Sequence, residues 1–286
     1  MIVVGVDGSR AALEAVAWAA REAHLRAVPL LIAHAMPGWA IEEHGGRLAE
    51  VARWMREGAV GVLQAAVARA RQEEPKLEVD TALLAGDPRT ALTEAAGQAR
   101  LLVVGDCGLG PVRGLLIGSV AYGVAAHSRG DVVIVRSPRP NQGGDIVVGI
   151  DGSEASELVL AAAFAEASLR GVRLRAVHAW TWLEAGGGFW PIPDDFDDAK
   201  AERRLMSEAL AGWRTRYPEV ELVEEVVRGH AVDVLRQASE HAGLLVVGSQ
   251  GYSAVAGLAF GSVSRAMLHH APCPVMVVRT PRGEGR

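Results

Sequence analysis

The sequence predicts an α/β fold that occurs twice in tandem, each copy being a five-stranded parallel sheet sandwiched between helices. MIVVGVDGS at 1–9 returns as DIVVGIDGS at 145–153, and VVIVRSP at 132–138 returns as VMVVRTP at 275–281. The distance along the sequence between a segment and its repeat, from 1 to 145 or from 132 to 275, is far longer than the roughly 20–50 residues of solenoid repeats. The sequence therefore contains a duplicated domain. Within each copy, short apolar runs alternate with helical patterns, an alternation that is typical of parallel sheets.

The boundary between the copies is marked by PRPNQGG at 138–144, which is rich in proline and glycine and is interpreted as a linker. We therefore expect a first domain over 1–139, a linker over 140–144 and a second domain over 145–286.

Composition narrows the class of protein. The 286 residues are 50% hydrophobic, and their formal net charge is −5. An acidic chain argues against nucleic acid or an anionic membrane as the main partner. The sequence shows neither a secretory signal nor an apolar run long enough to cross a membrane, so we expect a cytoplasmic location. Two cysteines, Cys107 and Cys273, encode no disulfide framework.

The strands of the first copy are predicted from apolar runs that would be covered on both faces. Ser9 is expected to cap a helix over 10–26. A longer helix over 47–74 should end at Pro75, with Leu48, Val51, Met55, Val62, Ala66 and Ala70 on one buried stripe. The predicted strands are 2–6, 28–35, 77–84, 101–105 and 132–136.

A glycine-rich loop follows the fourth strand of each copy. The spacing is Gly105-x2-Gly108-x9-Gly118-Ser119 in the first copy, and the second repeats it from Gly248. Such loops lie at the carboxyl edge of the sheet, where ligands bind in open α/β folds. Glycine lets main-chain N–H groups approach an anion, and the following helix N-terminus favours negative charge. The plainer interpretation is a tight strand-to-helix connection, in which the serine simply caps the helix.

Other phosphate-binding and catalytic motifs fail on inspection. The sequence has no G-x-x-x-x-G-K-[ST], no C-x-x-C, no H-E-x-x-H and no G-x-S-x-G. Gly108-x-Gly110-x-x-x-Gly114 misses the dinucleotide spacing by one residue and follows the wrong strand.

The paired glycine loops and VG[VI]DGS openings resemble the universal stress protein family in its tandem two-domain form. The resemblance implies strand order 3-2-1-4-5 and an adenine nucleotide, ATP, ADP, AMP or cAMP, in each domain, with Mg²⁺ bound through the phosphates. It places Asp7 beside the ribose and adenine, the main chain of Ala35 at the adenine edge, and the glycine loop at the ribose and phosphates. The implied site residues are Gly5, Asp7, Ala35, Gly105, Gly108, Gly110, Arg113, Gly118, Ser119 and Val120, then Gly149, Asp151, Ala179, Gly248, Gly251, Ser253, Gly261, Ser262 and Val263.

The two loops differ in charge. Arg113 supplies a cation in the first, whereas YSAVAGLAF at 252–260 supplies none. We expect the second site to depend more on Mg²⁺ or to accept fewer phosphates. The alternative is that Arg113 is a solvated surface residue.

Several residues have a structural interpretation beside a functional one. His34 and His178 fit hydrogen-bonded core imidazoles, and Asp7 and Asp151 could simply cap the turn that follows. Cys107 could be a redox-sensitive thiol, whereas Cys273 is interpreted as structural. The connection at 181–198 could be a lid or an interface. The last strand of each copy should lie at a sheet edge, and pairing of these two strands about a pseudo-twofold axis would satisfy both edges.

Three functions fit the sequence. The first is a non-enzymatic regulator in which nucleotide binding shifts conformations and partner contacts. The second is a slow ATPase or adenylating enzyme, although the loops contain no lysine and, beyond the aspartate, no recurring carboxylate. The third is an assembly module with structural nucleotide sites. A homodimer and an unidentified regulatory protein are the expected protein partners.

Overall fold

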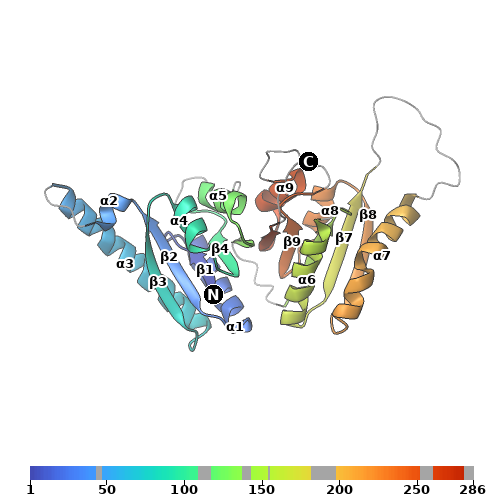
Figure 1. Ribbon diagram of the computed structural model, residues 1–286, viewed down its shortest axis with the longest axis horizontal. Coiled ribbons are helices and arrows are strands. Elements are labelled where there is room, and N and C mark those ends of the chain that lie inside the picture. Colours follow the sequence, from blue (N-terminus) through green and yellow to red (C-terminus); the bar gives the residue numbers. More distant parts are fainter. Residues whose placement is uncertain are drawn as a thin grey trace, which may run out of the picture. The chain divides into compact units, whose positions relative to one another are not determined.

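The computed structural model describes residues 1–42, 47–108, 117–136, 143–153, 155–181, 198–251 and 260–279. The chain forms two compact units, Met1–Pro140 with Pro274–Arg279, and Asn141–Cys273 with Thr280–Arg286. In each unit, strands lie side by side with helices packed against them (Figure 1).

The first unit contains a parallel sheet in the order β3-β2-β1-β4-β5, as the family resemblance implied. Ile2 pairs with Leu30 on one side and with Leu101 on the other, and every residue of β1 is buried. The bounds of its strands are β1 Ile2–Gly5, β2 Leu30–Met36, β3 Val79–Ala85, β4 Leu101–Gly105 and β5 Val132–Val135.

The strand β10 (Val275–Val278) comes from the second sequence copy but belongs to the first unit. It pairs antiparallel with β5, with Val275 opposite Ile134 and Val277 opposite Val132. The Arg279 guanidinium then donates from Nε to the Ser128 carbonyl at 2.7 Å. The predicted pairing of the two last strands is thus confirmed, while the pseudo-twofold axis stays a prediction.

The second unit repeats the parallel arrangement, with β9, β6, β7 and β8 in that order. Ile146 of β6 pairs with Leu174 and with Leu244, as Ile2 pairs with Leu30 and Leu101. The bounds are β6 Ile146–Ile150, β7 Leu174–Trp180, β8 Leu222–Arg228 and β9 Leu244–Gly248.

Helices cover both faces of the first sheet. A Cβ on Gly5 would meet Leu92 of α4, whereas a Cβ on Gly105 would meet the α1 backbone. Gly5 pairs with Val104, so Gly5 and Gly105 face opposite sides of the sheet. The helices are α1 Arg10–Leu25, α2 Gly38–Ile41, α3 Arg47–Glu73, α4 Pro88–Ala95, α5 Ser119–His127, α6 Ser156–Arg170, α7 Asp198–Arg216, α8 Ala231–Ala238 and α9 Ser262–His270.

The local predictions hold with small shifts. Ser9 caps α1 as predicted, since its hydroxyl accepts from Ala12 N at 3.1 Å. β2 begins at Leu30 instead of 28 because Ala27 adopts a positive φ of 50° and Pro29 follows it. α3 ends at Glu73, a residue earlier than predicted.

The predicted stripe on α3 is wrong at its N-terminal end. Ala66 and Ala70 are fully buried, but Leu48 is 56% exposed and Val51 46% exposed. Helical periodicity identifies the apolar face of a helix, but it does not show along which part of the helix that face packs against the sheet. Among the described residues, no helix is both long and apolar enough to cross a membrane.

The close packing of β4 against α1 gives a testable prediction. A Cβ on Gly105 would stand 2.7 Å from the Ala11 carbonyl carbon, so Gly105→Ala should cost about 1–3 kcal/mol, the usual range for overpacking. Gly58 is the matched control, because it lies within α3 and a Cβ added there would meet nothing within 4 Å. Gly58→Ala should gain about 0.5–1 kcal/mol. Urea-unfolding midpoints should move in opposite directions, and an unchanged midpoint for Gly105→Ala would contradict the packing.

Candidate functional site

Each candidate site begins at the loop that follows the first strand of a copy. Asp7 follows β1 and Asp151 follows β6, and the next residue, Gly8 or Gly152, turns the chain at φ 84° or 76°. Asp7 Oδ1 accepts from Ser9 N at 2.9 Å, and Asp151 Oδ1 accepts from Ser153 N at 3.0 Å. Each carboxylate therefore does organise its own turn, the structural role that the sequence allowed.

The loop after the fourth strand of each copy lies directly against this carboxylate. A Cβ on Gly108 would overlap Asp7 Oδ2, and a Cβ on Gly251 would overlap Asp151 Oδ2. Glycine is required at both positions because main chain and carboxylate touch, a close approach that any side chain would prevent. The equal spacing of the two loops therefore reflects equal geometry.

The helix after each loop supplies main-chain N–H groups. Gly118 and Gly261 are the N-caps of α5 and α9, so the neighbouring serines, Ser119 and Ser262, begin the helices and do not cap them. The N–H groups of the first helical turn have no partner within the helix.

One expectation about the glycines needs correction. Gly118 N donates to Asp106 O at 2.7 Å, and Gly261 N donates to Ser249 O at 3.0 Å. These two N–H groups close the loop and are already satisfied, so the donors available to an anion start at Ser119 and Ser262. A Cβ on Gly118 would stand 3.4 Å from Asp106 O, an ordinary contact, so the close approach in this loop is made by Gly108 against Asp7.

In the first unit these elements line a cavity of about 360 Å³. The predicted residues that it brings together are Gly5, Asp7, Ala35, Gly105, Gly108, Gly118, Ser119 and Val120. Gly110 and Arg113 lie outside the described residues, so their places are not assigned.

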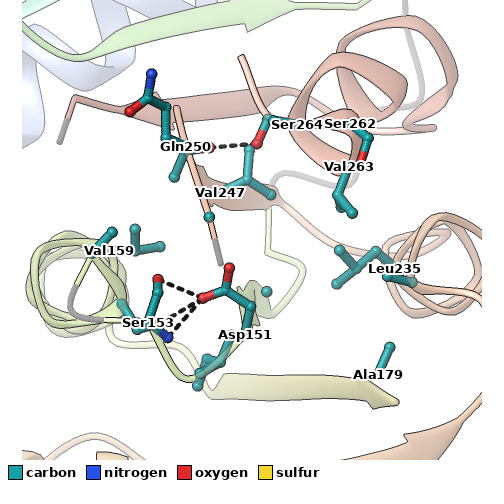
Figure 2. A pocket seen from close by; sticks show the side chains of 18 of the residues that line it. Asp151, Ser153, Val159, Ala179, Leu235, Val247, Gln250, Ser262, Val263 and Ser264 are labelled. Carbon is teal, nitrogen blue, oxygen red and sulfur yellow. Dashed lines mark hydrogen bonds between the residues drawn. The ribbon is translucent and has the colours of Figure 1, made fainter. Parts of the chain in front are cut away.

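The second unit holds a matching cavity of about 400 Å³ (Figure 2). Asp151 and Ser153 lie on one side of it, and Ser262 and Val263, at the start of α9, lie on another (Figure 2). Leu235 and Ala179 line a third side. The predicted residues that line it are Gly149, Asp151, Ala179, Gly248, Gly251, Gly261, Ser262 and Val263. Ser253 and most of the 181–198 connection, from 182 to 197, lie outside the described residues.

Sequence reasoning missed the apolar wall of both cavities. Leu92 of α4 and Leu235 of α8 stand at corresponding positions, and Val104 and Val247 lie beside them. The available signal was weak, since a leucine on a short amphipathic helix is typical of any core. Cavities of about 300–1,000 Å³ with apolar walls and a few polar groups are typical of small-molecule sites.

The two histidines serve structural roles, as their positions in the sequence suggested. His34 Nδ1 lies 2.7 Å from Val6 O, and His178 Nδ1 lies 2.8 Å from Ile150 O. Since a carbonyl only accepts, Nδ1 carries the proton in both rings. His178 Nε2 also lies 2.8 Å from a carboxylate oxygen of Glu202 on α7.

The environment of Cys107 disfavours its thiolate. Burial raises the pKa of the Cys107 thiol above its ordinary value, and the hydrogen bond with the Asp106 carboxylate and its negative charge raise it further. Cys107 lines the first cavity, but a raised pKa is the opposite of what a redox-sensing thiol needs.

This environment predicts slow alkylation. At pH 8 iodoacetamide should modify Cys107 more slowly than it modifies glutathione, as measured by mass spectrometry of the labelled peptide. Asp106→Asn should raise the rate because the substitution removes a nearby negative charge, and Cys107→Ser serves as the unlabelled control. A rate at or above that of glutathione would contradict the assignment.

Among the described residues, no group of three His, Cys, Asp or Glu side chains is placed to hold a metal ion. A nucleotide fits the residues present, because each cavity combines main-chain donors at a helix N-terminus, glycines that approach the aspartate closely and an apolar wall.

Comparisons with known proteins agree with this geometry. The sequence model of the universal stress protein family matches twice, at residues 1–136 and 144–279. The chain is 38% identical to universal stress protein Rv2623 of Mycobacterium tuberculosis and 34% identical to a universal stress protein of Mycolicibacterium smegmatis, covering 97% of this chain and 96% of each relative. A universal stress protein from Archaeoglobus fulgidus has the same fold, with a TM-score of 0.72, 19% identity and 97% of both chains covered. The chain therefore belongs to the universal stress protein family, with two tandem copies of the family domain.

Proposed function

We propose that the protein binds one adenine nucleotide in each domain and acts as a nucleotide-dependent regulator in a stress response. The observation that carries this proposal is the repeated cavity, in which glycines at the start of a loop, a helix N-terminus and an aspartate converge in both units. Main-chain N–H groups at a helix N-terminus favour phosphate.

The cavity residues divide between the two ends of the nucleotide. The N–H groups of Ser119 and Val120, and of Ser262 and Val263, would hold phosphates. The aspartate would accept hydrogen bonds from the ribose or the base, because a carboxylate repels phosphate. The main chain of Ala35 or Ala179 would face the adenine edge, with Leu92 or Leu235 against the ring. Bound Mg²⁺ would neutralise the phosphates, held by them instead of by protein side chains.

We propose binding without significant turnover. Among the described residues that line the two cavities, neither set contains a lysine or an arginine. Even with Mg²⁺ on the phosphates, phosphoryl transfer needs a group that positions the nucleophile, and among the described lining residues the only carboxylate, Asp7 or Asp151, would lie at the nucleoside end. Nucleotide binding would change the populations of the protein's conformations. A second copy of the chain or another cytoplasmic protein would bind one of these conformations preferentially.

Titration calorimetry with ATP and Mg²⁺ tests the stoichiometry. We expect two nucleotides per chain. Ala35→Phe fills the first cavity and Ala179→Phe the second, so each variant should bind one. Ala65→Phe, on the exposed face of α3, is the control and should still bind two. ATP at 100 times its Kd should stabilise each loaded unit by about 2.7 kcal/mol and raise its Tm. Absence of binding in the unmodified chain would contradict the proposal.

The charge difference between the loops gives a separate prediction. In Ala179→Phe, where only the first site is open, Arg113→Ala should weaken ATP binding several-fold while leaving adenosine binding unchanged, because a cation acts on the phosphates. No effect on either ligand would assign Arg113 to the solvated surface, whereas an equal effect on both would contradict its action on the phosphates.

A further inference from the structure

The two sites hold their aspartates differently. In the first unit the Ser9 hydroxyl accepts from Ala12 N at 3.1 Å and donates its proton to the Cys107 carbonyl at 3.4 Å. Asp7 Oδ1 then accepts from Ser9 N alone among the described donors, at 2.9 Å. Ala12, five residues after Asp7, has no hydroxyl to add.

In the second unit three donors converge on one oxygen. Asp151 Oδ1 accepts from Ser153 N at 3.0 Å, from Ser153 Oγ at 2.7 Å and from Ser156 Oγ at 3.0 Å. Figure 2 shows the bonds from Ser153 reaching the carboxylate at the edge of the cavity. Ser156 stands five residues after Asp151, so it replaces Ala12 of the first copy.

The helix that follows has changed to allow this. α1 begins at Arg10, three residues after its aspartate, whereas α6 begins at Ser156, five residues after its own. Ser153 caps no helix, because the N-cap of α6 is Ala155. Ser153, Ala155 and Ser156 line the second cavity, whereas Ala12 is the described residue of α1 that lines the first.

Two further lining positions carry a more polar side chain in the second cavity than in the first. Gln250 lines the second cavity where Cys107 lines the first, and Ser264 replaces Ala121. The Ser264 hydroxyl donates to Gly248 O and so fixes the strand end to the helix. Among the described lining residues, the second site thus carries more hydroxyl and amide side chains, while His34 lines only the first.

Resting on the proposed function, we infer that the two sites are unequal: the second binds the nucleoside part of its ligand more tightly, and Ser156 is the positioning residue responsible. A carboxylate that is fixed before the ligand arrives loses less conformational freedom on binding. The second site therefore takes adenosine or a monophosphate with little help from a phosphate tail, while the first relies on the tail. The two sites would then fill in different ranges of ligand concentration.

Adenosine is the probe, because it has no phosphate and isolates the nucleoside end. Titrated into Ala35→Phe, it reports the second site, and into Ala179→Phe, the first. We expect a Kd at least about fivefold lower at the second site. In the Ala35→Phe background, Ser156→Ala should raise that Kd about three- to tenfold, the range of one ordinary net hydrogen bond, because Ser156 acts through the carboxylate and does not touch the ligand.

Conservative rescue separates positioning from folding. Ser156→Thr keeps the hydroxyl and should keep the affinity within about twofold, whereas Ser207→Ala, on the exposed surface of α7, controls for loss of any serine. Equal adenosine affinities at the two sites, or an unchanged Kd in Ser156→Ala, would overturn the inference while leaving the proposed function standing. Failure of the unmodified chain to bind either adenosine or ATP would instead overturn the proposed function and this inference with it.

Discussion

The close approach of a glycine main chain to an aspartate carboxylate determines the rest of this structure. Gly108 lies on Asp7, and Gly251 lies on Asp151, with no room for a Cβ. This contact joins the loop after the fourth strand of each copy to the loop after the first, and so closes one side of each cavity. The loop can then place the N-terminus of α5 or α9 across from the aspartate, and Gly118 N or Gly261 N fixes that placement by bonding back to the strand end. The cavity thus results from main-chain geometry.

This construction explains how an acidic chain could hold an anion. Helix N-termini and turns of glycine concentrate partial positive charge without a formal cation, an effect that grows where water is excluded. The aspartate on the opposite side makes the cavity electrostatically asymmetric. Its carboxylate repels an anionic group, and the helix N-terminus attracts one. A ligand with an anionic end and a hydrogen-bond-donating end therefore matches both units. In each cavity one leucine, Leu92 or Leu235, provides an apolar surface against which a ring of the ligand can pack.

The sequence predicted what local pattern and internal repetition encode. Five strands of the first copy, the Ser9 cap and the glycines at the cavity follow from apolar runs, capping chemistry and spacing, and the strand order came from the family resemblance. It did not predict features that depend on tertiary contact. Leu92 and Leu235 look like ordinary core residues until their helices are placed, and the use of Gly118 N in closing the loop depends on where the Asp106 carbonyl points. The exception is the pairing of β10 with β5, which the unpaired edges of the two predicted sheets did indicate, although the sequence did not show that β10 then belongs to the first unit.

The two copies use the serine that follows each aspartate in different ways, one for helix capping and one for holding the carboxylate of the site. The serine two residues after each aspartate has one hydroxyl proton, and the two copies direct it differently: Ser9 Oγ donates to Cys107 O at 3.4 Å, whereas Ser153 Oγ donates to Asp151 Oδ1 at 2.7 Å. In the first copy it caps a helix, a contribution of about 1 kcal/mol, and leaves its aspartate with a single main-chain donor among the described residues. In the second copy it holds the aspartate, and the helix starts two positions later relative to that aspartate. Ser156 makes the second arrangement favourable, because it adds a donor at the point where Ala12 offers only a methyl group. The two copies therefore differ at this point by one hydroxyl, Ser156 in place of Ala12, and by the acceptor to which the preceding serine donates.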